Sequence, residues 1–216
     1  MNAVALATPV ALTEAQAGLW FAQQLAPDNP SFNTAHAVWI DGPLDVAAFV
    51  AAADQAAVEA EAFALRFAEG DDGQPLQWYD PAHVPRLSVR DVSAEADPAA
   101  AARGLMQADR LSPVDPTRDR ISQQLLLDLG RQRWVWYLRV HHLAADGYGM
   151  ALFTDRMCAL YAGRTGEPLP GLAGVLADDV AYRADPRRAL AGQWWREHMQ
   201  GAPAGVGLAG THAASD

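Results

Sequence analysis

Cysteine is nearly absent from this 216-residue sequence, which contains only Cys158. One cysteine cannot form an internal disulfide or a zinc site built from several thiolates. Cys158 lies in a stretch with a helical pattern, and we expect a free, buried thiol. Such a thiol fits the reducing conditions of the cytoplasm.

Basic residues are also scarce, with 16 lysines and arginines against 26 acidic residues and a formal net charge of −10. A negative surface repels phosphate backbones and anionic lipid, so we expect neither a nucleic-acid partner nor a membrane partner. No apolar run approaches the roughly 20 residues that span a bilayer. The apolar first twelve residues lack the basic region of a secretory signal, and we therefore expect a cytoplasmic protein.

Half of the residues are apolar, which is enough for a packed core. Helical and strand patterns follow each other without regular βαβ alternation, so we expect an α+β fold with a mixed β-sheet packed by helices. The turn at residues 69–74 predicts a hairpin, and the last two strands are expected to pair antiparallel. The expected helices cover residues 13–25, 45–60, 98–110, 148–162 and 193–199, and the expected strands cover residues 32–40, 63–68, 76–79, 87–92, 121–129 and 134–140.

The segment HHLAADG, residues 141–147, follows the last expected strand directly. Neighbouring side chains on a strand point to opposite faces, so only one of His141 and His142 can face a given cavity. That imidazole can act as a base or hydrogen-bond acceptor near neutral pH. Asp146 can orient the turn or pair with a basic group. Gly147 lets the main chain approach a substrate, and free amides at the start of the next helix can stabilise negative charge.

Structural interpretations of the same residues stay open. Paired histidines at a strand end are more often structural than catalytic, and Asp146 alone reads as the N-cap of the next helix. A metal site from His141, His142 and Asp146 is disfavoured because adjacent strand histidines diverge. The segment DGYG lacks the third glycine of a dinucleotide fingerprint. The residues alone therefore predict a histidine acid–base site at a strand-to-helix turn, or a structural histidine pair.

Four segments, in order, resemble the condensation domains of nonribosomal peptide synthetases, which are related to chloramphenicol acetyltransferase. HHLAADG fits the HHxxxDG signature of that family, and Gln16 and Trp20 stand at characteristic places of its opening motif. The strings RWVWYLRVHHLAADG and MQAD are similar to siderophore synthetases of the enterobactin type. The other three similar segments are LTEAQAGLWFAQQL at 12–25, FNTAHAVWIDGPLDVAAF at 32–49 and QWWREHMQGAP at 193–203.

The resemblance implies a chloramphenicol acetyltransferase-like lobe at residues 1–175. Residues 176–216 would then form a helical connection toward a second lobe and a flexible tail. The implied reaction is peptide bond formation, in antibiotic or siderophore biosynthesis, between an acyl donor and an aminoacyl acceptor. Phosphopantetheine tethers both substrates to peptidyl carrier proteins, and no metal or directly bound cofactor is implied.

The resemblance also assigns roles to the motif residues. His142 would accept the proton of the attacking amine or hold that amine in place, and Gly147 would bring a backbone amide to the thioester carbonyl. His141 and Asp146 would support the site, with Asp146 paired to an arginine.

Two departures from the family pattern matter. The segment AEAFALRF, residues 60–67, stands where a form like HEALRTRF is usual, so Ala64 replaces the expected arginine. Arg66 and Arg139 become the candidate partners of Asp146. The chain also ends about where the second lobe would begin.

The leading interpretation is an excised first lobe, nearly inactive alone, that works with a second lobe and downstream synthetase domains. A half-domain that only docks a carrier protein, and a trimeric acyltransferase, are the alternatives. The short leader before Thr13 suggests a donor delivered by a separate protein.

Overall fold

The computed structural model describes residues 8–202. The chain divides into two compact units, residues 1–177 and residues 178–216. Within the described residues, all strands and the candidate site belong to the first unit. The expected division at residues 175 and 176 stays a prediction, and the expected flexible tail at 203–216 lies outside the described residues.

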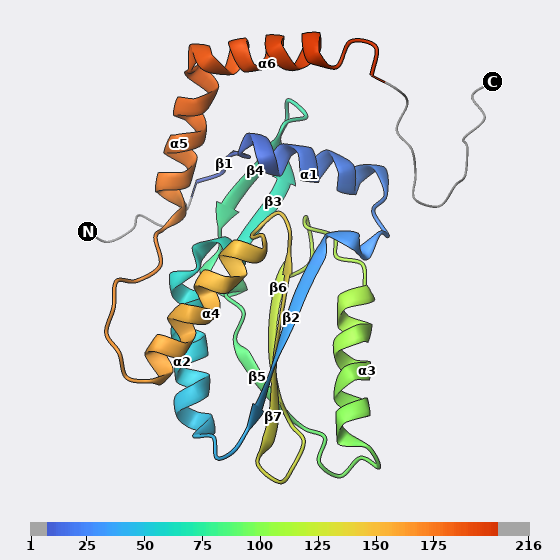
Figure 1. Cartoon of the computed structure of the whole chain (residues 1–216), viewed down its shortest axis with the longest axis vertical. Helices are drawn as coiled ribbons and strands as arrows, with labels where there is room; N and C mark the ends of the chain where they lie inside the picture. Colours follow the sequence, from blue (N-terminus) through green and yellow to red (C-terminus); the bar gives the residue numbers. More distant parts are fainter. Residues whose placement is uncertain (1–7, 203–216) are drawn as a thin grey trace, which may run out of the picture. The chain divides into compact units, whose positions relative to one another are not determined.

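A four-stranded mixed sheet is the centre of the first unit (Figure 1), in the order β2-β7-β6-β5. β7 pairs antiparallel with β2 along its whole length, so that His141 lies opposite Asn33. β6 pairs antiparallel with β7 and parallel with β5, which confirms the mixed sheet and the expected antiparallel pair. The strands are β2 (Asn33–Asp41), β5 (Leu87–Asp91), β6 (Ser122–Asp128) and β7 (Arg133–His141).

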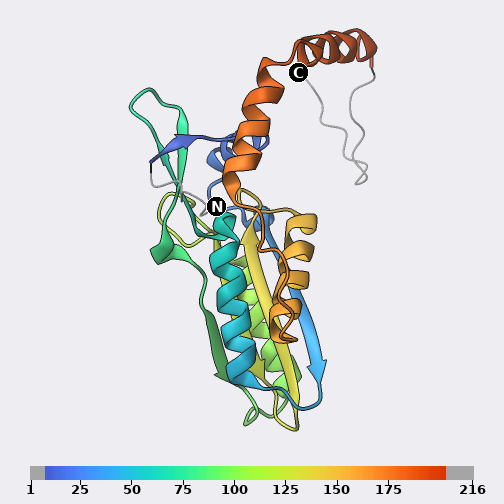
Figure 2. The ribbon, with the colours of Figure 1, turned by 90° about the vertical axis from the view of Figure 1, so that its left-hand side faces the viewer.

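Helices cover both faces of this sheet (Figures 1 and 2). Side chains alternate along β7, so Trp136 and Leu138 pack with α2 and α4 while Val135 packs with α3. α2 covers Val46–Glu59, α3 covers Pro98–Leu111 and α4 covers Gly147–Tyr161. These bounds agree with the expected helices to within one or two residues.

A smaller antiparallel sheet has the order β1-β4-β3. Its strands are β1 (Val10–Ala11), β3 (Leu65–Glu69) and β4 (Pro75–Tyr79), with the predicted hairpin between the last two. The expected strand at 63–68 begins too early, because Phe63 and Ala64 lie in a 3₁₀ turn, η2 (Glu61–Ala64). Phe63, Ala64 and Leu65 are all buried. A regular strand would point the middle side chain to the opposite face of the sheet, whereas the turn departs from that alternation.

Local capping explains where several helices begin. Thr13 and Gln16 form a capping box at the start of α1 (Glu14–Leu25). The side chains of Asp45 and Asp97 accept the backbone N–H of Ala48 and Ala100 at the start of α2 and α3. These caps confirm the helix starts expected from the sequence.

The helical region after residue 170 departs from expectation. The sequence predicts one helix around 193–199, whereas the structure has α5 (Leu172–Ala184) and α6 (Pro186–His198). α5 buries none of its residues, and the side chain that binds its first N–H comes from the distant Glu61, so no local pattern identifies this helix. No helix within residues 8–202 is both long enough and apolar enough to cross a bilayer. The prediction of a buried Cys158 is wrong: its free thiol lies on an exposed position of α4.

A buried ion pair connects α3 to β7. The Arg139 Nε donates to Asp109 Oδ2 at 2.9 Å, and the Tyr137 hydroxyl donates to the same oxygen at 2.8 Å. Arg139 is only 5% exposed. Burial, followed by the neighbouring carboxylate of Asp109, raises the pKa of Tyr137 well above its usual value. The Asp109 carboxylate therefore accepts hydrogen bonds from both Tyr137 and Arg139 of β7.

Replacing Asp109 by alanine should strongly destabilise the fold, because the charge of Arg139 stays buried without its partner. We expect a loss of about 3–5 kcal/mol in the free energy of unfolding, measured by urea denaturation. Arg118→Ala is the matched control, since the Arg118–Asp115 pair is largely exposed, with 79% of the Arg118 side chain accessible. Its loss should stay below about 1 kcal/mol. Equal losses in the two variants would contradict this account.

Candidate active site

The HHLAADG segment forms the turn between β7 and α4. β7 ends at His141, and α4 begins at Gly147. The backbone N–H of His141 donates to Ile121 O at 2.7 Å, and that of His142 donates to Phe32 O at 2.8 Å. Backbone hydrogen bonds therefore fix both histidines. Successive residues at the end of a strand point their side chains in different directions.

His141 points into the protein, where it is 1% exposed. Its Nδ1 accepts the backbone N–H of Leu143 at 3.2 Å, so the proton of the neutral ring is on Nε2, 3.3 Å from Gln23 Oε1. Burial lowers the pKa of His141 to about 4, and the nearby charges of His142 and Arg139 act in the same direction. This ring is a neutral structural group.

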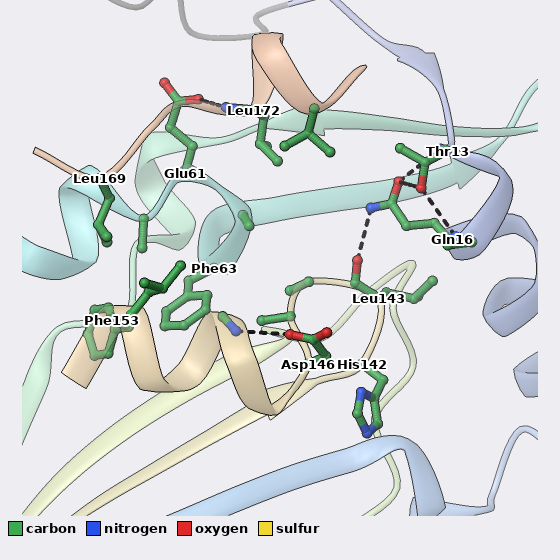
Figure 3. A pocket seen from close by; sticks show the side chains of 18 of the residues that line it. Thr13, Gln16, Glu61, Phe63, His142, Leu143, Asp146, Phe153, Leu169 and Leu172 are labelled. Carbon is green, nitrogen blue, oxygen red and sulfur yellow. Dashed lines mark hydrogen bonds between the residues drawn. The ribbon is translucent and has the colours of Figure 1, made fainter. Parts of the chain in front are cut away.

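His142 is half-buried and lines a cavity beside the turn. In Figure 3 its imidazole extends from the turn toward the β2 side, away from Phe63 and Leu169. No hydrogen bond to its ring is formed within residues 8–202. Both ring nitrogens are therefore available to an incoming group.

Asp146 is the N-cap of α4, as expected from the residues alone. Its Oδ1 accepts the backbone N–H of Gly149 at 2.9 Å. Neither candidate arginine reaches it: Arg139 pairs with Asp109, and Arg66 contacts His83 Nε2 at 2.6 Å and Thr117 O at 3.0 Å. The position of the usual family arginine, Ala64, is fully buried.

Gly147 is the first residue of α4 and is exposed. Its backbone N–H has no acceptor in the part of the chain that the structure describes. A Cβ built on Gly147 would meet no atom within 4 Å. The space at the Cβ position of Gly147 is therefore open, and its N–H is one of the donors at the start of a helix that lack an intrahelical acceptor.

The cavity beside the turn has a volume of about 580 Å³ and lies within the first unit. The carboxylate of Glu61 holds one wall by accepting the backbone N–H of Leu172 at 2.8 Å. Glu59 accepts the N–H of Leu169 at 3.2 Å and pairs with Arg156. Most of the lining is apolar and includes Leu19, Phe63, Leu152, Phe153, Leu169 and Leu172.

The wall formed by residues 169–172 was not expected from the sequence. Glu59 and Glu61, two residues apart, bind this wall, but nothing in the local sequence links them to a segment about 110 residues away. Within residues 8–202, no three His, Cys, Asp or Glu side chains gather as a metal site would require.

Comparisons with known proteins identify the family. The condensation domain model matches residues 7–208. A dimodular nonribosomal peptide synthase of Bacillus subtilis (strain 168) is 39% identical over 204 residues, which cover 92% of this chain and 8% of the synthase. Enterobactin synthase component F of Escherichia coli O157:H7 is 30% identical over 219 residues, which cover 95% of this chain and 17% of that protein.

A solved structure of a variant starter condensation domain of rhizomide synthetase RzmA, in complex with C8-CoA and Leu-SNAC, superposes with a TM-score of 0.87. It is 35% identical, and the match covers 95% of this chain and 48% of that one. The chain therefore belongs to the condensation domain family and has the chloramphenicol acetyltransferase-like fold, as the sequence resemblance predicted. It spans about half the length of the solved condensation domain that it matches.

The lowered pKa of His141 predicts a specific acid sensitivity. Because the folded-state pKa of about 4 lies below the usual histidine value of 6.5, the unfolded chain takes up a proton between these values and the folded chain does not. The contribution of His141 to stability should be fully present above pH 6.5, fall by about 3 kcal/mol as the pH decreases to 4, and change no further below that.

Urea denaturation at several pH values measures this change. The variant His141→Gln has no titrating ring at this position, so its stability should depend less steeply on pH than that of the wild type. Identical pH dependence in the two proteins would show that His141 is protonated equally in the folded and unfolded states.

Proposed function

We propose that this chain is the histidine-bearing half of a condensation domain that forms amide bonds in nonribosomal peptide synthesis. The observation that carries the proposal is the free ring of His142, held at the end of β7 beside an open cavity in a member of this family. The site is completed by a second lobe, and the isolated chain is nearly inactive.

The proposed reaction is attack of the acceptor α-amino nitrogen on the donor thioester carbonyl. The new C–N bond forms, the C–S bond breaks, and the donor phosphopantetheine thiol leaves. His142 accepts the proton of the attacking amine or holds that amine by a hydrogen bond. An unpaired imidazole suits either role near neutral pH, since it offers an acceptor nitrogen to the substrate.

Gly147 is proposed to supply the backbone N–H that faces the thioester oxygen. Negative charge develops on that oxygen as the amine adds, and a donor held in the first helical turn stabilises it without reorganisation. The open space beside Gly147 supports this role, because the substrate carbonyl needs room to approach the amide. His141 and Asp146 support the site through their hydrogen bonds to the turn backbone.

The proposed partners are a donor and an acceptor peptidyl carrier protein, together with the second lobe and downstream synthetase domains. The substrates arrive on phosphopantetheine arms, and no directly bound cofactor is needed. The RzmA structure with C8-CoA and Leu-SNAC supports this arrangement by analogy, since both compounds are thioester-type ligands of that protein. We also propose a cytoplasmic location, where reducing conditions keep the exposed Cys158 thiol reduced.

Replacing His142 by alanine in a two-lobed domain that includes this chain should lower the condensation rate about 10²–10⁴-fold. Loaded donor and acceptor carriers are the substrates, and mass spectrometry of the acceptor carrier measures the amide product. His141→Ala should mainly lower the yield of folded protein. Normal amide formation by His142→Ala would refute the assignment. Carrier cross-linking to a wild-type domain that forms no product would support the docking alternative instead.

Gly147→Ala should separate catalysis from stability. The added methyl group meets no atom of the chain, so we expect the melting temperature to change by no more than a few degrees. The methyl group would occupy the space proposed for the thioester carbonyl, and we expect a rate loss of roughly 10²-fold. Gly18→Ala is the matched control, because its Cβ also meets nothing within 4 Å and it lies on α1. Equal rates for these two variants would remove Gly147 from the mechanism.

A further inference from the structure

One face of α1 carries two glutamines directed at the turn that holds His142. Gln16 and Gln23 are seven residues apart, which is about two helical turns, so they lie on the same face. Trp20, between them, is 3% exposed and packs in the same core cluster as Leu143. This face of α1 is therefore buried against the motif turn.

Gln16 holds the carbonyl of Leu143 directly (Figure 3). Its Nε2 donates to Leu143 O at 2.9 Å and to Gln77 Oε1 at 2.8 Å. Gln77 is 1% exposed and returns a hydrogen bond to Gln16 Oε1 at 2.8 Å. Gln16 Oε1 also accepts the N–H of Thr13 at 3.0 Å. Both donor hydrogens of the Gln16 amide are thus used, which leaves its side chain one orientation.

Gln23 holds the amide of Leu143 indirectly. This residue is 2% exposed, and its Oε1 lies 3.3 Å from Nε2 of His141. The other ring nitrogen of His141 accepts the N–H of Leu143 at 3.2 Å. The Nε2 of Gln23 donates to Pro27 O at 2.9 Å and is therefore fixed as well. α1 thus controls both polar backbone groups of Leu143.

The His141 contact restricts the residue that precedes Leu143, and the Gln16 contact holds the next peptide group along the turn. The N–H of His142 is bonded to Phe32 O, and the peptide group that follows His142 is the one that His141 holds. Fixing both flanking peptide groups fixes the φ and ψ angles of His142, so its side chain leaves the backbone in one direction.

We propose that Gln16 and Gln23 are positioning residues for His142 and act through the backbone of Leu143. This inference rests on the proposed function, since the group that they position is the one proposed to meet the acceptor amine. A displacement of about 1 Å at a reacting group can lower a rate about 10²-fold, so the loss of either contact should affect catalysis more than folding.

Gln16→Glu tests the direct contact. Glutamate is the usual partner in a capping box, so it keeps the acceptor for Thr13 N–H and the start of α1. It lacks the N–H groups that bind Leu143 O and Gln77. Gln16→Met removes the same donors without adding charge, and it carries the test if the glutamate variant does not fold. Gln24→Glu is the matched control, because Gln24 is exposed on the same helix.

In the two-lobed domain, we expect both Gln16 variants to lower kcat by 10- to 100-fold per folded molecule. The KM for the acceptor carrier should stay within about twofold, and the control should match the wild type. A purely structural role would lower the folded fraction and leave kcat per folded molecule unchanged. That result would overturn the proposal.

NMR of the 216-residue chain gives a readout that does not need catalysis. The ring signals of His142 and the amide signal of Leu143 should shift or broaden in both Gln16 variants and stay in place in Gln24→Glu. Unchanged signals would also overturn the positioning role. If the wild-type domain makes no amide, or His142→Ala retains full activity, the proposed function fails, and these NMR signals still decide whether Gln16 orders the turn.

Discussion

The alternation of side chains at the end of β7 is the constraint on which the site depends. Two adjacent histidines cannot face the same side of a strand, and the structure buries the first of them. His141 becomes a neutral hydrogen-bonding group between Gln23 and the N–H of Leu143. Because that position is fixed, His142 points to another side, and no described residue forms a hydrogen bond with its ring.

The two sheets and α1 bring distant segments to this turn. Full-length pairing with β2 places Asn33 opposite His141, and the bond from His142 N–H to Phe32 O continues the pairing past the strand end. The smaller sheet contributes Gln77 from β4, which pairs with Gln16 of α1. The HHxxxDG motif is thus held by main-chain and amide contacts from three other parts of the chain.

The acidic side chains near the site accept hydrogen bonds from backbone N–H groups. Asp146 caps α4, while Glu59 and Glu61 hold the backbone of residues 169–172. Within residues 8–202, His142 lines the cavity with no hydrogen bond to its ring, and Gly147 follows five residues later at the start of α4. In the proposed reaction, the imidazole accepts a proton from the amine while a helix N-terminus stabilises the developing negative charge.

Local signals in the sequence predicted most elements of this fold. Thr13, Asp45, Asp97 and Asp146 each cap a helix within three residues, so the information lies in a short window. The opposite orientations of His141 and His142 followed from strand geometry alone.

Features that depend on distant contacts could not be predicted in this way. β1 has two residues and exists only through its pairing with β4. The expectation of a buried Cys158 failed because its apolar neighbours Met157 and Phe153 occupy the inner face of α4 instead. The two candidate arginines found partners contributed by other elements: Asp109 on α3 for Arg139, and His83 after β4 for Arg66. No local pattern encodes those pairings.

The central claim is that His142, and not His141, meets the acceptor amine. The most direct measurement is NMR of the histidine ring signals in the two-lobed domain while an aminoacyl thioester of N-acetylcysteamine is added. The account predicts a saturable shift of the His142 ring signals with those of His141 unchanged. A shift confined to His141, or no shift of either ring at saturating ligand, would contradict it.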